Sequence, residues 1–285
     1  MARWWGDRLG GFAAAVGPGY SEFMTYQNIL YERQDRVVRL TLNRPDSLNP
    51  LSWDTIKELG TAFAEINTDP EVVIVVVTGA GKAFSAGGDL KGYLGLYKQP
   101  AEFRRYLSDF FDLCAQLERS DKIVVAAVNG ACVAGGLELL LCCDLAVAAD
   151  EARIGDGHLN FGQLPGAGGS QRLPRAIGAF RAKELMFSGR LLSGPEAAAI
   201  GLVNRSVPRV RLMAEVETMI EEYLTKSPAG LAGTKHLVNE GLRGSLEAGL
   251  QLEMSFVYNW ATASHDATEG LIAFDEKRTP DFKGC

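Results

Sequence analysis

The stretch Val133-Ala134-Gly135-Gly136-Leu137-Glu138 is the most informative part of the sequence. A turn of small residues opens there into an apolar helical segment that carries one carboxylate, that of Glu138. A Gly-Gly step lets a ligand come close to the backbone. The first amide hydrogens of a helix have no partner inside it, so they are free to face a developing negative charge. The stretch therefore predicts an oxyanion site with an acid/base group beside it.

Segments with the pattern of strands and of helices alternate on both sides of this stretch. Val72 to Val77 and Ile123 to Val128 are nearly unbroken apolar runs, as expected of strands buried on both faces of a parallel sheet. Between them, residues 103–117 carry an apolar stripe at helical spacing. Ile29 to Leu42 predicts a hairpin, and Ser52 is a predicted N-cap of the helix that follows it. This order predicts βαβ units.

Three regions follow from the changes in pattern along the chain. Residues 1–24 have no long apolar region and no clear cleavage pattern, so we expect a poorly ordered leader and not a signal peptide. Residues 25–207 are expected to form an α/β core. Residues 208–285 are rich in helix formers and predict a helical C-terminal subdomain, whose apolar stripes need to pack on the core or on a neighbouring subunit.

Composition excludes several classes of function. The 285 residues are 47% hydrophobic and 22% charged, which suits a globular protein with a sizeable core. A net charge of −6, a pI near 5.3 and the lack of a Lys/Arg run argue against binding to nucleic acid. The longest apolar stretch, residues 123–149, is interrupted by Asn129, Glu138 and Asp144, so we expect no membrane span. Without metal-binding neighbours, Asp144 is expected to cap a strand or a helix.

The cysteines indicate where the protein works. There are five, an odd number, and none forms a C-x-x-C motif, so neither a disulfide framework nor a zinc site is predicted. A reducing compartment, the cytoplasm, is the expected location.

Two further glycine-rich segments carry a signal. Ala83 to Leu90 follows a predicted buried strand, as the stretch ending at Glu138 does, and open α/β sheets bind ligands at the carboxyl ends of their strands. We therefore predict that the amides of Ala86 and Gly135 together hold a ligand's carbonyl oxygen. Pro165 to Arg175 begins another helix but matches neither a P-loop nor a dinucleotide fingerprint, which argues against a kinase or a dehydrogenase.

Together, these segments resemble the crotonase family, also called the enoyl-CoA hydratase/isomerase superfamily, over roughly residues 26–283. The matching motifs are Asn43-Arg44-Pro45, Ala83 to Leu90, Gly135 to Leu139, Cys143-Asp144 and Pro165 to Leu173. The resemblance implies an α/β fold with a spiral core of repeated ββα units and a helical C-terminal trimerisation region. It also implies a homotrimer or a dimer of trimers. The substrates would be acyl-CoA thioesters, with coenzyme A as part of the substrate and no separate cofactor or metal.

The resemblance also implies roles for particular residues. The amides of Ala86 and Gly135 would match the family's oxyanion hole, which polarises the thioester carbonyl so that an enolate can form. Contacts to substrate and CoA would come from Ala83, Ser85, Gly88, Asp89, Leu90 and Lys91. Phe274 and Lys277 are placed to reach the CoA of a neighbouring subunit.

The predicted catalytic pair departs from the family pattern. Hydratases of the family use two glutamates; Glu138 falls on the first position, and His158 falls on the second. A histidine can act as acid or base at neutral pH, and Asp156 is placed to orient its ring. Two alternatives stay open: His158 shares the proton transfers with Glu138, or it only makes hydrogen bonds in the pocket. Burial would raise the pKa of Glu138 and helix-start amides would lower it, and the sequence does not decide between them.

Three functions remain compatible with these residues. The leading one is an enoyl-CoA hydratase or isomerase that stabilises an enolate. The second is a hydrolase of a β-diketone or of the thioester, which would use Asp156 and His158. The third is acyl-CoA binding without turnover. His236 and His265 stand outside the motifs and are expected to be ordinary hydrogen-bonded residues.

Overall fold

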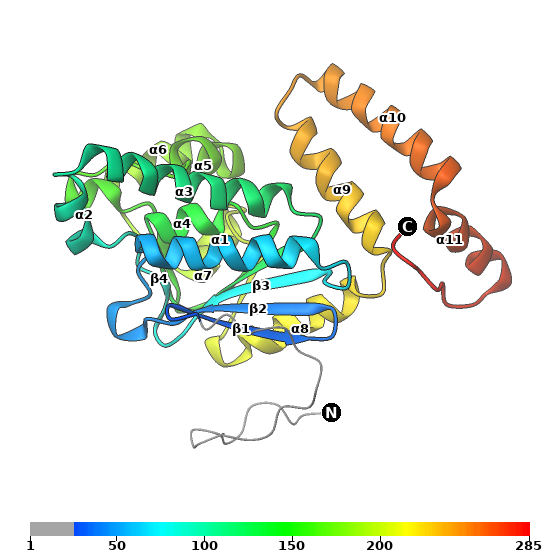
Figure 1. Ribbon diagram of the computed structural model, residues 1–285, viewed down its shortest axis with the longest axis horizontal. Helices are drawn as coiled ribbons and strands as arrows, with labels where there is room; N and C mark the ends of the chain where they lie inside the picture. Colours follow the sequence, from blue (N-terminus) through cyan, green and yellow to red (C-terminus); the bar gives the residue numbers. More distant parts are fainter. Residues whose placement is uncertain (1–25) are drawn as a thin grey trace.

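Two sheets with helices around them form the body of the protein (Figure 1). The computed structural model describes residues 26–285, so the predicted leader lies outside the described residues. The larger sheet has six strands in the order β1-β2-β3-β5-β7-β9. These strands are β1 (Ile29–Gln34), β2 (Val37–Leu42), β3 (Ile74–Gly79), β5 (Ile123–Val128), β7 (Leu145–Ala149) and β9 (Arg205–Val207).

The predicted strand pattern of the larger sheet is confirmed. β1 and β2 form the antiparallel hairpin, and every other neighbouring pair in this sheet is parallel. All six residues of β5 are buried, because helices cover both faces of the sheet. In Figure 1, α1 (Trp53–Thr68) and α3 (Pro100–Arg119) lie on one side of it and α8 (Leu212–Tyr223) on the other.

The two covering helices begin and pack as their sequences predict. Ser52 caps α1, because its side chain accepts a hydrogen bond from the backbone N–H of Thr55 at 3.4 Å. The apolar stripe of α3 packs against α1, and Phe110, Leu113 and Leu117 are buried.

The smaller sheet positions the candidate site. It consists of β4 (Ala83–Ser85), β6 (Ala131–Val133) and β8 (Arg153–Gly155), paired in parallel. Each short strand follows a long one, β3, β5 or β7, and a helix or helical turn comes next. This is the repeated ββα unit that the family resemblance implies. Because the three short strands are parallel, their carboxyl ends lie at one edge.

The remaining short helices surround this edge or extend the body. They are α2 (Leu90–Leu96), α4 (Gly135–Leu140), α5 (Gly169–Ile177), α6 (Ala179–Ser188) and α7 (Gly194–Ala199). No helix in residues 26–285 is both long and apolar enough to cross a membrane.

The C-terminal helices divide into two groups. α8 packs on β5 and β7, whereas α9 (Pro228–Gly241), α10 (Leu246–Ala263) and α11 (His265–Glu276) extend from the body as an arm (Figure 1). Lys235 anchors the arm to the body. Its Nζ donates hydrogen bonds to the carbonyl oxygens of Leu117 and Lys122, at 2.8 and 2.9 Å. The same atom lies 2.8 Å from Asp144 Oδ2. Asp144 Oδ2 also accepts from the N–H of Val124 at 2.7 Å, so this residue caps the start of β5 as predicted.

Candidate active site

Three loops meet at the carboxyl edge of the smaller sheet. The loop after β4 carries Gly88, the turn after β6 carries Gly135 and leads to Glu138, and the turn after β8 carries Asp156 and His158. The parallel pairing of the strands therefore brings all the principal candidate residues to one edge.

Two glycines allow the first two loops to pack backbone against backbone. A Cβ on Gly136 would lie 2.4 Å from the carbonyl oxygen of Ser85, which is too close for any residue with a side chain. Gly87 has φ +102°, and a Cβ there would lie 2.8 Å from the carbonyl oxygen of Val133. Ala134, which precedes α4, has φ 52° and ψ −117°, a conformation that costs a non-glycine residue energy and is often found at functional sites.

The pair of open amides differs from the predicted pair. The N–H of Ala86 donates to the carbonyl oxygen of Leu48 at 2.9 Å, so the prediction that this amide binds a ligand oxygen is wrong. The amides of Gly88 and Gly135 donate to no acceptor among residues 26–285. A Cβ on Gly135 would lie 3.5 Å from Gly88 N, so these two amides are neighbours. The edge therefore offers one open pair, from Gly88 and Gly135.

Glu138 is buried and held by backbone amides. Its side chain is 3% exposed, and Oε1 accepts from the N–H groups of Ala167 and Gly169 at 2.7 and 2.9 Å. Burial raises the pKa of Glu138, although the Gly169 amide, His158 and the Ala167 amide oppose the shift. Burial is thus the larger of the two influences that the sequence left undecided.

The third glycine-rich segment has a role that the sequence did not reveal. Its amides at Ala167 and Gly169 fix one oxygen of Glu138, which leaves Oε2 for other partners. The segment therefore binds a carboxylate of the protein itself through backbone amides at a helix start.

His158 lies beside Glu138 and is oriented by Asp156. Nδ1 of His158 is 3.0 Å from Asp156 Oδ2, and Asp156 is 1% exposed. The Asp156 carboxylate accepts a hydrogen bond from the Nδ1–H group, which leaves Nε2 facing the site. His158 Nε2 lies 3.8 Å from Glu138 Oε2. The structure therefore brings together the three side chains predicted to form the acid/base group.

The other residues predicted on the loop after β4 have different environments. Ala83 and Ser85 are buried, and Ser85 Oγ accepts from the N–H of Gly87 at 3.2 Å, so these two support the turn and offer no ligand surface. Asp89 is the N-cap of α2. Leu90 and Lys91, at the start of α2, are exposed.

Phe274 and Lys277 are not brought to this edge within one chain. Both lie at the end of α11 on the arm, and Phe274 is 85% exposed (Figure 1). Of the histidines outside the site, His265 Nδ1 lies 3.1 Å from Asp266 Oδ1, and the ring of His236 lies 5.6 Å from that of Phe256.

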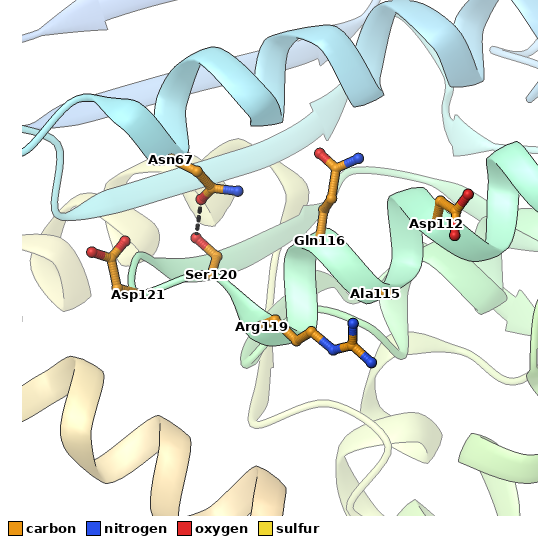
Figure 2. A pocket seen from close by; sticks show the side chains of 7 residues that line it. All are labelled: Asn67, Asp112, Ala115, Gln116, Arg119, Ser120 and Asp121. Atoms are coloured by element: carbon orange, nitrogen blue, oxygen red, sulfur yellow. Dashed lines mark hydrogen bonds between the residues drawn. The ribbon is translucent and has the colours of Figure 1, made fainter.

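Two hollows lie away from the acid/base group. One, of about 480 Å³, is between the ends of α1 and α3, where Figure 2 shows the Ser120 hydroxyl bonded to Asn67 Oδ1 and Gln116 pointing between the helices. The other, of about 990 Å³, lies between the body and the arm and is lined in part by Lys235 and Trp260. Neither is lined by a predicted site residue. Within residues 26–285, no group of three or more His, Cys, Asp or Glu side chains could hold a metal ion.

The fold and the site define a class of protein: an α/β protein in which two open amides lie at the same sheet edge as a buried carboxylate and a histidine. The sequence profile of the family described as "Enoyl-CoA hydratase/isomerase" matches residues 32–285. The chain belongs to this family, which is the crotonase superfamily.

Individual relatives are similar over nearly their whole length. A protein of Mycobacterium bovis named "Probable enoyl-CoA hydratase" is 39% identical over 259 residues, which cover 91% of this chain and 99% of the relative. The crotonyl-CoA hydratase of Syntrophomonas wolfei is 36% identical over 261 residues, with the same two shares. The crystal structure of an enoyl-CoA hydratase from Bacillus anthracis has a TM-score of 0.86 at 38% identity, covering 91% of this chain and 100% of that one.

Proposed function

We propose that this protein is an enoyl-CoA hydratase, which adds water across the C2=C3 double bond of a 2-enoyl-CoA thioester. The observation that carries the proposal is the placement of Glu138 and His158 beside the open amides of Gly88 and Gly135. The names of the relatives support it. The reaction needs no cofactor beyond the coenzyme A that the substrate carries, and it belongs to fatty-acid metabolism.

The two amides act as an oxyanion hole. The thioester oxygen accepts hydrogen bonds from Gly88 and Gly135, and these bonds strengthen as the oxygen takes up the negative charge of an enolate. Losing one donor of this kind typically costs about a hundredfold to a thousandfold in rate.

The acid/base pair supplies and removes the protons. Ionised Glu138 takes a proton from water through Oε2 while the water oxygen bonds to C3, and the protonated His158 ring gives its Nε2 proton to C2 of the enolate. Glu138 then returns its proton to His158 across their 3.8 Å separation, so the cycle adds one water and closes. Asp156 holds the ring in place and stabilises its positive charge.

A specific contact favours hydrolysis as the second candidate. The Asp156–His158 pair, at 3.0 Å, is an arrangement that activates water as a nucleophile. Water attacking the thioester carbonyl in the same oxyanion hole would release free CoA. The product therefore separates the candidates.

We further propose a homotrimer or a dimer of trimers, located in the cytoplasm. The arm exposes large apolar side chains that a monomer would leave in water: Leu246, Leu250, Met254, Val257, Leu271 and Phe274. In such an assembly, Phe274 and Lys277 contact the CoA of a neighbouring subunit. All five cysteines are free thiols, which fits a reducing compartment.

The test uses crotonyl-CoA and longer 2-enoyl-CoA thioesters with the full-length protein. We expect 3-hydroxyacyl-CoA, detected by mass spectrometry, and a loss of most activity in Glu138→Gln, which keeps the size of the side chain. Tracking free thiol in the same reactions detects hydrolysis. If no enoyl-CoA in the series gains water, the hydratase proposal is wrong; release of CoA instead supports the second candidate.

A further inference from the structure

Five aromatic side chains from α2 and α3 form a cluster that the proposed mechanism does not use. Its members are Tyr93, Tyr97, Phe103, Tyr106 and Phe110. The rings of Tyr93 and Tyr106 meet edge to face at 5.5 Å, and those of Tyr97 and Phe103 at 4.9 Å. Such contacts fix ring orientations. The aromatic cluster therefore holds any polar atom on these rings in a defined place.

Two hydroxyl groups meet inside the aromatic cluster. The oxygens of Tyr93 and Tyr106 are 2.8 Å apart, and the Tyr106 hydroxyl also lies 3.2 Å from the carbonyl oxygen of Leu51. Tyr106 is 1% exposed, so its single hydrogen goes to one of these two acceptors. When Tyr106 donates to Leu51, Tyr93 donates to Tyr106. The opposite arrangement frees the hydrogen of Tyr93 and needs only rotation about two C–O bonds.

Both hydroxyls keep their hydrogens at neutral pH. Burial raises the pKa of Tyr93, and burial raises that of Tyr106 far above its usual value, with the negative charge of Glu138 contributing to both shifts. Each residue is therefore a hydrogen-bond donor and not an anion.

The Tyr93 hydroxyl lies next to Gly88, the residue that carries one of the two open amides. A Cβ on Gly88 would be 2.0 Å from the Tyr93 oxygen, so this hydroxyl touches the α-carbon of Gly88. On the other side, a Cβ on Gly135 would be 3.5 Å from Phe110 Cε1. The aromatic cluster thus borders both amides of the proposed oxyanion hole.

We propose that Tyr93 is a third hydrogen-bond donor to the thioester oxygen and that Tyr106 is the positioning residue behind it. This inference rests on the proposed function. In the free protein, Tyr93 donates to Tyr106. When a thioester oxygen binds at Gly88 and Gly135, the Tyr93 hydrogen turns to that oxygen, and the Tyr106 hydrogen turns from Leu51 to Tyr93. A donor to an oxygen that becomes charged stabilises the enolate more than the bound substrate.

The experiment compares Tyr93→Phe and Tyr106→Phe with Tyr97→Phe as the matched control. Tyr97 belongs to the same cluster, but its hydroxyl bonds to Gln163 instead of the pair. We expect Tyr93→Phe to lower kcat about tenfold to a hundredfold with little change in KM. Tyr106→Phe should have a smaller effect of the same kind, and Tyr97→Phe none.

A spectroscopic measurement separates polarisation from a structural effect. The carbonyl stretch of a bound 2-enoyl-CoA or unreactive acyl-CoA should shift to lower frequency on the wild-type protein, and less so on Tyr93→Phe. An unchanged stretch in Tyr93→Phe would overturn the inference, whether or not kcat falls. This measurement needs no turnover, so it tests Tyr93 even if the protein hydrates no enoyl-CoA, a result that would contradict the proposed function alone.

Discussion

Replacing Lys235 with methionine tests how the arm is held to the body. The Lys235 side chain is 4% exposed, and its ammonium group lies 2.8 Å from the Asp144 carboxylate, whose side chain is 16% exposed. Methionine keeps most of the apolar stem but removes the charge and all three donors. The variant therefore removes the ammonium group from a largely buried carboxylate and from two carbonyl oxygens.

The expected loss in the free energy of unfolding is about 3–5 kcal/mol, the cost of leaving one member of a buried ion pair alone. The loss depends on pH in a defined direction. Burial raises the pKa of Asp144, and Lys235 is the main group that opposes the shift. Without Lys235 the pKa rises further, so the folded variant takes up a proton more readily than its unfolded chain does. The deficit is then largest at neutral pH and shrinks as the pH falls through the raised pKa.

Urea unfolding at fixed protein concentration measures this loss, with Lys183→Met as the control. Lys183 is exposed on α6, so its replacement should change the free energy of unfolding by less than about 0.5 kcal/mol. The double variant Lys235→Met/Asp144→Asn should recover part of the loss, because it removes the unpaired charge. If Lys235→Met alone unfolds within about 0.5 kcal/mol of the wild type, the anchoring argument is refuted.

The site yields three further predictions. Glu138→Gln should lower the hydration rate about a hundredfold to ten-thousandfold. It should also raise the melting temperature at neutral pH, because the raised pKa of Glu138 means that its charged form destabilises the fold. This gain in melting temperature should narrow as the pH falls and Glu138 takes up its proton, and equal melting curves of the two proteins at all pH values would contradict the reasoning. Asp156→Asn should reduce kcat more than it changes KM, because the histidine ring loses its orienting carboxylate; steady-state kinetics showing only a KM change would argue against that role. Gly136→Ala should destabilise the protein by about 1–3 kcal/mol in urea unfolding and abolish turnover, because its Cβ would lie 2.4 Å from a carbonyl oxygen. The control Gly95→Ala, whose Cβ would have no atom within 4 Å, should be neutral or slightly stabilising in the same unfolding experiment.

The strands were predictable because burial on both faces leaves a direct mark on the sequence. Residues 72–77 and 123–128 contain no polar residue, and the structure has β3 and β5 in these regions. The pairing of Glu138 with His158 was also predicted, but through the family resemblance, because the short strand β8 that precedes Asp156 and His158 has no clear pattern in the sequence.

Contacts between distant segments could not be predicted from the sequence in this way. The amide of Ala86 looks free in the sequence, but its acceptor, Leu48, lies in a loop before α1, and the left-handed turn at Gly87 presents the amide of Gly88 instead. The two amides that hold Glu138 come from a segment about thirty residues away, which no local pattern connects to it. Hydrogen bonds over such separations depend on the completed fold.

The separate origin of the site's groups has a consequence for how its chemistry can diversify. The amides of Gly88 and Gly135, the carboxylate of Glu138 and the Asp156–His158 pair come from three different strand ends of the smaller sheet. A substitution after β8 can therefore exchange one side chain for another while the amides of Gly88 and Gly135 keep their positions. The position after β8 can thus hold a histidine or a glutamate without any change to the backbone that presents the two open amides.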